Sequence, residues 1–156
     1  MIEINIPGRG TLSIKYLVLD YNGTIALDGD LVGQVREKIN LLAERLDVYI
    51  ITADTHGWCA KACQGLNAKL HILSRPIGGP EKRDFVNELG AEFVAAVGNG
   101  ANDALMLEKS GLGIAVIGPE GVAVKSVVAA DVAVTNIIDA FDLLLLPKRL
   151  IATLRE

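Results

Sequence analysis

The chain is poor in several residue types, and each shortage excludes a class of protein. It has 2 cysteines among 156 residues, too few for the disulfide framework of a small secreted domain. Lys and Arg number 15 against 19 Asp and Glu, a formal net charge of −4, which argues against a surface that binds nucleic acid or a charged membrane. No apolar stretch reaches the roughly 18 residues of a membrane helix, and no apolar segment near the N-terminus resembles a secretory signal. We therefore expect a cytoplasmic protein that binds neither nucleic acid nor membrane.

The sequence does contain enough apolar material for one ordinary core. Hydrophobic residues make up 51% of the chain and charged residues 22%, which excludes a disordered or low-complexity protein. A length of 156 residues corresponds to about one domain, and neither a linker nor an internal repeat divides it. We expect residues 1–156 to form a single domain.

Short, nearly continuous apolar runs alternate with longer segments of helical pattern. Continuous hydrophobicity is typical of strands that are buried on both faces, as in a parallel sheet. The expected strands are 16–19, 48–51, 70–73, 93–97, 114–117 and 132–134, and the expected helices are 31–46, 56–66, 81–90, 101–109, 120–129 and 137–146. The pattern predicts an α/β fold with a doubly wound, Rossmann-like parallel sheet sandwiched by helices. Two alternating stretches, 2–6 and 11–14, add an N-terminal β-hairpin at the sheet edge.

Polar clusters follow three of these expected strands. They are Asp20-Tyr21-Asn22-Gly23-Thr24, Thr52-Ala53-Asp54 and Gly98-Asn99-Gly100-Ala101-Asn102-Asp103. Ligands of doubly wound folds bind at the carboxyl ends of the strands. We therefore expect the three clusters to meet at one edge of the sheet.

The residue types in these clusters suit phosphoryl chemistry. An aspartate directly after a buried strand, such as Asp20, can act as a carboxylate nucleophile, and the glycine that follows permits a sharp turn whose amides can cradle phosphate oxygens. Thr52 can donate to a phosphoryl oxygen, Lys82 can neutralise charge, and Asp103 can help to hold a hard divalent cation. Each signal is weak by itself, because Asp-rich strand ends are often simple turns.

Taken together, these residues resemble the four motifs of the haloacid dehalogenase (HAD) superfamily in their order along the chain. The matching residues are Asp20-x-Asn22-Gly23-Thr24, Thr52, Lys82 and Gly98-x-Gly100-x-Asn102-Asp103, and the match covers residues 14–135. Within the superfamily, the stretch from Lys82 to Leu105 looks most like the phosphorylation domain of P-type ATPases and of their small soluble relatives.

The resemblance implies a Mg²⁺-dependent phosphatase or phosphoryl transferase that acts on a phosphorylated small molecule or macromolecule. It makes Asp20 the nucleophile that carries an aspartyl phosphate, with Thr52 and Lys82 as catalytic partners. The phosphate-binding residues would be Asn22, Gly23, Thr52, Ala53, Lys82 and Asn102. The Mg²⁺ ligands would be Asp20, the carbonyl of Asn22, Asn99 and Asp103.

Two asparagines depart from the family pattern. Asn22 stands where HAD phosphatases carry the aspartate that protonates the leaving group and activates water, and an amide cannot transfer protons in this way. Asn99 stands where the fourth motif usually places a metal-binding aspartate, and the missing charge is expected to weaken Mg²⁺ binding. These changes predict a slow phosphatase. The alternative is a catalytically degenerate domain that binds phosphate or a partner in a regulatory or structural role.

The intervals between the motifs are too short for a cap domain. The chain from Asp20 to Thr52 has room for a flap at 25–30 and one helix, and the chain from Thr52 to Lys82 for a helix, a strand and a turn. The site is therefore expected to be open. An open site and the apolar run 143–146 are both compatible with a homo-oligomer.

Three soft metal-ligand types lie close together after the second strand. His56, Cys59 and Cys63 can share one face of a helix, but a structural zinc site normally needs four ligands and the neighbourhood offers no fourth. Buried thiols and a capping histidine are the preferred interpretation. Asp54 is expected either to orient Asn99 or Lys82 or to cap the following helix.

Overall fold

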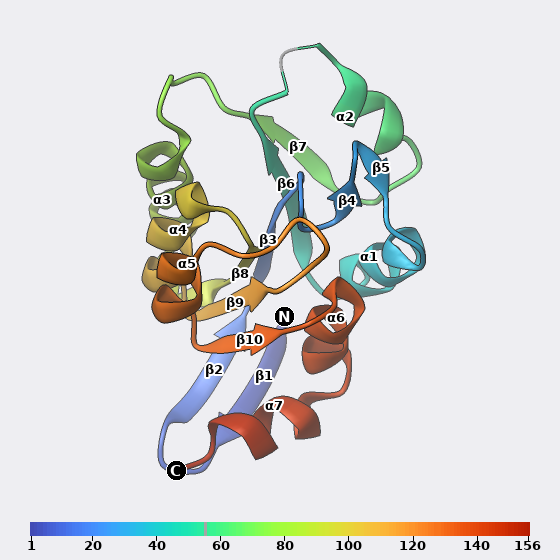
Figure 1. Ribbon diagram of the computed structural model, residues 1–156. Helices are drawn as coiled ribbons and strands as arrows, with labels where there is room; N and C mark the ends of the chain where they lie inside the picture. Colours follow the sequence, from blue (N-terminus) through green and yellow to red (C-terminus); the bar gives the residue numbers. More distant parts are fainter. Residues whose placement is uncertain (55) are drawn as a thin grey trace.

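A six-stranded parallel sheet forms the centre of the computed structural model, which describes residues 1–54 and 56–156 (Figure 1). The strand order is β10-β9-β8-β3-β6-β7. The strands are β3 (Tyr16–Asp20), β6 (Asp47–Thr52), β7 (Lys69–Ile72), β8 (Val94–Gly98), β9 (Leu112–Val116) and β10 (Val132–Val134). The chain thus winds outward from β3 in one direction and then from β8 in the other, which confirms the expected doubly wound sheet.

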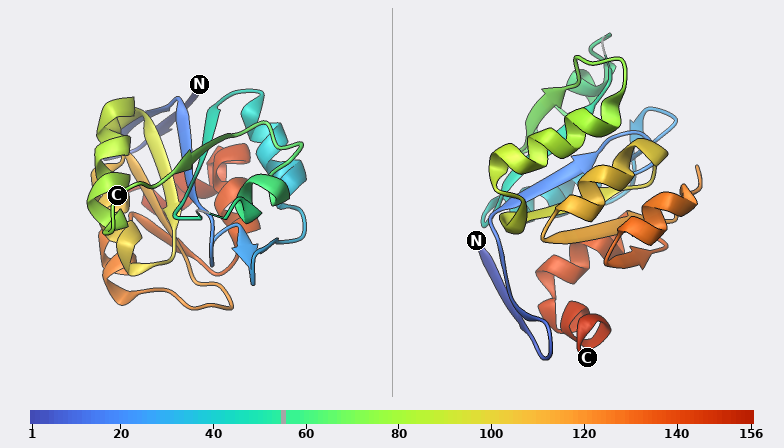
Figure 2. Two further views of the ribbon diagram at one scale, coloured as in Figure 1. Left: turned by 90° about the horizontal axis from the view of Figure 1, so that it is seen from above. Right: turned by 90° about the vertical axis from the view of Figure 1, so that its left-hand side faces the viewer.

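Each central strand is buried on both faces, which explains its nearly continuous hydrophobicity. In β3, Leu17 and Leu19 join the apolar cluster on one side of the sheet, and Val18 joins the cluster on the other side. The helices α3 (Gly78–Leu89), α4 (Ala104–Lys109) and α5 (Val124–Ala129) cover one face, and α1 (Val35–Ala43) and α6 (Ile137–Leu145) cover the other (Figure 2). The expected sandwich of helices is confirmed.

The expected N-terminal hairpin is present, but it does not join the edge of the large sheet. Strands β1 (Ile2–Ile6) and β2 (Gly10–Ile14) pair only with each other among the described residues. Alternate isoleucines of β1 are buried, and β1 lies against α7 (Pro147–Leu154), a helix that the sequence analysis did not predict. The hairpin and α7 therefore extend the apolar layer on the α6 side of the sheet.

The ends of several helices differ from the expected positions for local reasons. The chain around residue 31 belongs to the flap, in which β4 (Ala26–Leu27) pairs with β5 (Asp30–Leu31), so α1 begins later. Helix α3 begins at Gly78, and Pro80 lies within its first turn, where the missing N–H of proline has no intrahelical partner to lose. Before α4 the chain forms a 3-10 turn, η2 (Ala101–Asp103).

The connections near the carboxyl edge of the sheet are short. Between β3 and β6 lie the flap and α1, and the described chain between β6 and α3 holds α2 (Trp58–Ala62) and β7. This part of the chain contains no inserted cap domain among the residues described. Over 1–54 and 56–156, no helix has the length and apolar character needed to cross a membrane.

The close approach of α4 to β9 generates a prediction about stability. A β-carbon at Gly113 would lie 2.5 Å from the carbonyl oxygen of Leu107, so Gly113→Ala is expected to lower the free energy of unfolding by about 2 kcal/mol through overpacking. Urea denaturation measures this change. Gly118→Ala, whose nearest neighbour would lie at 3.5 Å, is the matched control, and equal losses in the two variants would contradict the explanation.

Candidate active site

A buried lysine joins two of the polar clusters. Lys82, on α3, donates from Nζ to Oδ1 of Asp20 and to Oδ1 of Asp103, at 2.6 Å in each case. Lys82 is 1% exposed and Asp103 is fully buried, whereas Asp20 keeps 8% of its surface exposed. The loops that follow β3 and β8 are therefore joined to α3 by one ammonium group, and Asp20 is the member of the triad that solvent can reach.

Asp103 is fixed by the loop that carries it. Its Oδ2 accepts hydrogen bonds from the backbone N–H groups of Asn99 and Gly100, at 2.9 and 2.8 Å. A β-carbon at Gly98 would lie 2.5 Å from the carboxyl carbon of Asp103, so only glycine leaves room for this packing. Both oxygens of Asp103 therefore have partners, and the carboxylate holds Lys82 in place.

Thr24 connects Asp20 to Asn99, a residue of the fourth motif. Its hydroxyl lies 3.2 Å from Oδ2 of Asp20 and 3.1 Å from Oδ1 of Asn99. A hydroxyl has one hydrogen to donate, so two acceptor oxygens converge on a single donor. Thr24 belongs to the first motif but not to the site predicted from the sequence, although the Gly-Thr pair after Asp20 was a usable signal.

The loop after β9, residues 117–123, also reaches the site, which the sequence analysis did not predict. The side-chain nitrogen of Asn99 donates to the carbonyl of Gly121 at 3.0 Å, and the Asn99 carbonyl accepts from the N–H of Ala123 at 2.8 Å. The rule about carboxyl strand ends, applied to β9 as well as to β3, β6 and β8, would have found this loop.

The other site residues predicted from the sequence lie at the same carboxyl edge of the sheet but form no side-chain hydrogen bond with the triad among the described contacts. Thr52 is buried at the end of β6, and its hydroxyl accepts from the N–H of Asp54 at 3.1 Å. Asn22 and Ala53 are exposed and line a shallow cavity of about 270 Å³. Asn102 is exposed, and its side-chain nitrogen would lie 3.7 Å from a β-carbon at Gly78, the first residue of α3.

Asp54 accepts hydrogen bonds from backbone N–H groups where the chain enters α2, whose N-cap residue is Gly57. The Asp54 Oδ1 accepts from the N–H of His56 at 2.8 Å and its Oδ2 from the N–H of Cys59 at 2.6 Å, which confirms the capping alternative. The Cys59 and Cys63 sulfurs lie 3.7 Å apart as free thiols. Within the described ranges, no group of three or more His, Cys, Asp or Glu side chains is arranged to hold a metal.

Burial and charge set the protonation of the triad. Burial, together with the neighbouring charge of Asp103, raises the pKa of Asp20 to about 6, although Lys82 opposes the change. Burial alone would lower the pKa of Lys82, but the charges of Asp20 and Asp103 outweigh it and hold that pKa above its ordinary value. At neutral pH the site therefore presents an ionised carboxylate beside a buried ammonium, an arrangement suited to nucleophilic attack on phosphorus.

The donor atoms near Asp20 suit a hard cation. Oδ2 of Asp20 and Oδ1 of Asn99 both point to the hydroxyl of Thr24, and hard divalent ions such as Mg²⁺ prefer oxygen ligands. The oxygens of Asp103, in contrast, are engaged by Lys82 and by backbone amides.

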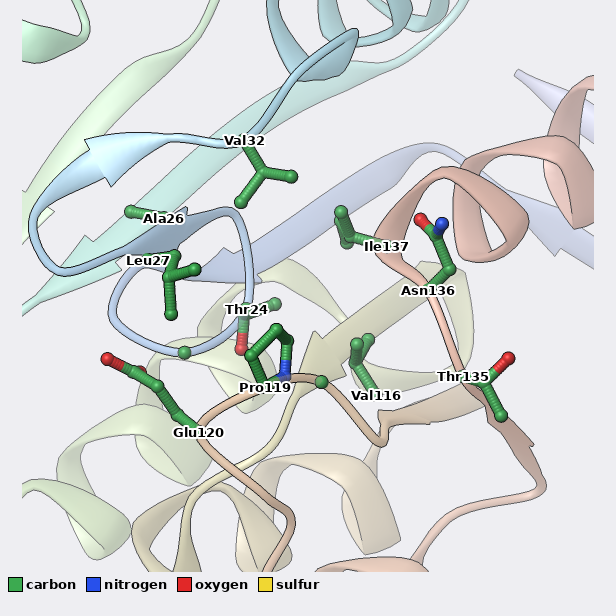
Figure 3. Close-up of a pocket in the computed structure, with 12 residues that line it drawn as sticks. Thr24, Ala26, Leu27, Val32, Val116, Pro119, Glu120, Thr135, Asn136 and Ile137 are labelled. Carbon is green, nitrogen blue, oxygen red and sulfur yellow. The ribbon is translucent and has the colours of Figure 1, made fainter.

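A cavity of about 220 Å³ lies beside Thr24 (Figure 3). Its walls come from the flap, the loop after β9 and the start of α6, and most of its lining side chains, including Leu27, Val116 and Ile137, are apolar. Thr24, whose hydroxyl lies near Asp20 and Asn99, is one of the lining residues, so the cavity adjoins the site.

The raised pKa of Asp20 predicts a pH-dependent gain in stability for Asp20→Asn. Because the folded-state pKa of about 6 exceeds the ordinary value of 3.8, the proton on Asp20 stabilises the fold below pH 3.8 and that contribution is lost as the pH rises through 6. In EDTA, thermal unfolding is expected to show the stability of the variant relative to the wild type rising by about 2 kcal/mol from pH 4 to pH 8. This change adds to the pH-independent cost of leaving Lys82 with one charged partner. Asp139→Asn, an exposed aspartate of α6, is the control. A stability difference between variant and wild type that stays the same from pH 4 to pH 8 would contradict this account.

Comparison with known proteins finds relatives in sequence and in fold. No protein-family model matches the chain. An uncharacterized protein of Methanocaldococcus jannaschii is 49% identical over 63 residues, which cover 40% of this chain and 68% of that protein. The chloroplastic copper-transporting ATPase of Arabidopsis thaliana is 32% identical over 108 residues, 67% of this chain but 11% of the ATPase. The chain thus spans a small part of that transporter.

Solved structures identify the fold. The cobalt-bound deoxy-D-mannose-octulosonate 8-phosphate phosphatase of Haemophilus influenzae superposes with a TM-score of 0.72 at 16% identity, over 88% of this chain and 90% of that one. A zinc-transporting P-type ATPase superposes with a TM-score of 0.63 at 23% identity, over 79% of this chain and 20% of that one. The chain therefore has the fold of the HAD superfamily, and it is similar to the phosphorylation domain of P-type ATPases.

Proposed function

We propose that this protein is a Mg²⁺-dependent phosphohydrolase that works through an aspartyl phosphate on Asp20. The observation that carries the proposal is the triad of Asp20, Lys82 and Asp103, in which a buried ammonium holds one partly accessible carboxylate at the carboxyl edge of the sheet. A buried ion pair is a weak source of stability, whereas perturbed carboxylates in such positions are typical of functional sites.

In the first step the Asp20 carboxylate attacks phosphorus. A bond forms between a carboxylate oxygen and phosphorus, the bond from phosphorus to the leaving-group oxygen breaks, and its electron pair departs with that oxygen. Lys82 limits the build-up of negative charge on Asp20 and the phosphoryl group, and the hydroxyl of Thr52 donates to a phosphoryl oxygen. The N–H group of Ala53 and the side chains of Asn22 and Asn102 complete the phosphate-binding surface. The N–H of Gly23 donates to the carbonyl of Ala26 at 2.9 Å, so Gly23 contributes to this surface through the turn that it permits.

In the second step water attacks phosphorus and the bond to Asp20 breaks, which regenerates the carboxylate and releases inorganic phosphate. Asn22, two residues after the nucleophile, cannot accept the proton of that water or supply one to the leaving group. The proton must therefore be exchanged with solvent. We expect slow turnover and a preference for substrates whose leaving group needs no protonation.

The residues that would hold Mg²⁺ are Asp20, Asn99 and the carbonyl of Asn22. The converging oxygens of Asp20 and Asn99 support this assignment. When bound, the cation would neutralise charge on the transferred phosphoryl group. Both carboxylate oxygens of Asp103 already accept hydrogen bonds, Oδ1 from Lys82 and Oδ2 from two backbone N–H groups. We therefore propose that Asp103 acts on the cation site by positioning Lys82.

The carboxyl edge of the sheet, which no cap covers among the described residues, bears on the size of the substrate. Similar HAD structures include the 3-deoxy-D-manno-octulosonate 8-phosphate phosphatase of Moraxella catarrhalis, 19% identical with a TM-score of 0.65 over 91% of this chain and 94% of that one, solved with magnesium, phosphate and its sugar acid. For this chain, we propose only that a phosphorylated small molecule or macromolecule binds at the carboxyl edge, where the described residues form no cap.

The proposal predicts Mg²⁺-dependent release of phosphate from acetyl phosphate and p-nitrophenyl phosphate. Phosphate release is expected to fall to background in Asp20→Asn and in EDTA, because the nucleophile or the cation is then missing. Asp139→Asn serves as the charge-matched control with unchanged rates. A wild type without activity at saturating Mg²⁺, in a folded state, would instead favour the binding or regulatory alternative.

The identity of residue 22 generates a separate prediction. Asn22→Asp introduces the missing acid/base group at the exposed mouth of the site, and general acid–base catalysis is typically worth at least about 100-fold. We expect steady-state hydrolysis of p-nitrophenyl phosphate to rise by about 10- to 100-fold. Asn87→Asp, on the exposed surface of α3, controls for the added charge, and an equal gain in both variants would contradict an acid/base deficit at Asn22.

A further inference from the structure

A carboxylate that belongs to none of the HAD-like motifs lies beside Asn99. Glu120, on the loop after β9, extends toward the turn that follows β3 (Figure 3). A β-carbon at Gly23 would lie 2.5 Å from Oε2 of Glu120 and 2.5 Å from the side-chain nitrogen of Asn99. The Glu120 oxygen therefore lies within about 5 Å of the Asn99 amide, the limit set by these two distances.

Gly23 makes this approach feasible. Its φ of +76° is a left-handed conformation that glycine adopts without strain. The space in which a side chain at position 23 would stand is occupied by the Asn99 amide and the Glu120 carboxylate. The turn after the nucleophile therefore brings these two groups close to the Asp20 loop.

Asn99 itself holds the Glu120 loop in place. Its side-chain N–H donates to the carbonyl of Gly121, the next residue after Glu120, and its backbone carbonyl accepts from Ala123. The hydroxyl of Ser126, on α5, adds a bond of 2.6 Å to the carbonyl of Gly100. An aspartate at position 99 has no donor for the Gly121 carbonyl. The Asn99 amide, which stands in place of a charged carboxylate, is thus the group that holds the loop carrying Glu120.

Glu120 changes the total formal charge of the site. Two ionised carboxylates, Asp20 and Asp103, and the ammonium of Lys82 sum to −1, and Glu120 brings the total to −2, which balances a divalent cation.

We propose that Glu120 supplies the negative charge that Asn99 lacks and thereby strengthens the binding of a divalent cation at the Asp20 site. This inference rests on the proposed function, because it assumes the cation site formed by Asp20, Asn22 and Asn99. It makes Glu120 a charge-compensating residue on a loop that the side chain of Asn99 holds through the carbonyl of Gly121.

The test is the Mg²⁺ dissociation constant of the full chain, measured by titration calorimetry without substrate. Removal of one negative charge within several ångströms of a divalent ion is expected to weaken binding about tenfold in Glu120→Gln. The matched control is Glu3→Gln, an exposed glutamate of the hairpin at the opposite end of the molecule from the carboxyl edge (Figure 1). Equal Mg²⁺ affinity in Glu120→Gln and Glu3→Gln would overturn the proposal.

A second comparison tests the compensation itself. Asn99→Asp restores a carboxylate at the site, so Asn99→Asp combined with Glu120→Gln is expected to bind Mg²⁺ within about threefold of the wild type. A double variant as weak as Glu120→Gln alone would count against compensation. A wild type that binds no Mg²⁺ would overturn the inference and the cation site together. Normal Mg²⁺ binding that depends on Glu120, without any phosphate release, would support this inference while the proposed hydrolase activity failed.

Discussion

The ion pairs of Lys82 are the interaction on which the rest of the site depends. An ammonium group that is 1% exposed is strongly unfavourable unless charged partners satisfy it. The two carboxylates of Asp20 and Asp103 meet that need at 2.6 Å each. Asp20 is the last residue of β3, and Asp103 lies on η2, which follows the neighbouring strand β8. Lys82 therefore fixes the relative positions of α3, the end of β3 and η2. Burial and the charge of Asp103 raise the pKa of Asp20 to about 6, although Lys82 opposes the change, and Asp20 keeps one edge open to solvent, as a nucleophile requires.

The parts of the fold that could be predicted are those dictated by burial. Strands such as β3 and β8 are apolar on both faces and so stand out in the sequence, and the carboxyl-edge rule correctly brought Asp20, Asn99 and Asp103 together. The start of α3 was placed late, at residue 81, although proline is tolerated within a first turn. Helix α7 was missed although Pro147 at its first position is a local start signal, and only its packing against β1 depends on the tertiary structure. Glu120 was missed because the carboxyl-edge rule was not applied to β9; its place beside Asn99, which depends on hydrogen bonds between two loops, follows only from the structure.

The two asparagines of the site have different structural consequences. Asn22 is exposed at the mouth, and its effect is the loss of a proton-transfer group. Asn99 is nearly buried and uses its amide as a donor to Gly121 and its oxygen near Thr24. An amide at position 99 is therefore a structural tie between the loops after β8 and β9, and Glu120 lies on the loop that it holds. This connection explains how a charge can be absent from one position and present close by without any change in the fold.

The central claim is that Asp20 becomes phosphorylated, and chemical trapping tests it most directly. After incubation with acetyl phosphate and Mg²⁺ and an acid quench, borohydride reduction would convert an aspartyl phosphate into homoserine, which peptide mass spectrometry can locate. The account predicts homoserine at position 20 and its absence when Mg²⁺ is withheld. Homoserine at position 103, or an unmodified chain under conditions in which Mg²⁺ binding is saturated, would contradict it.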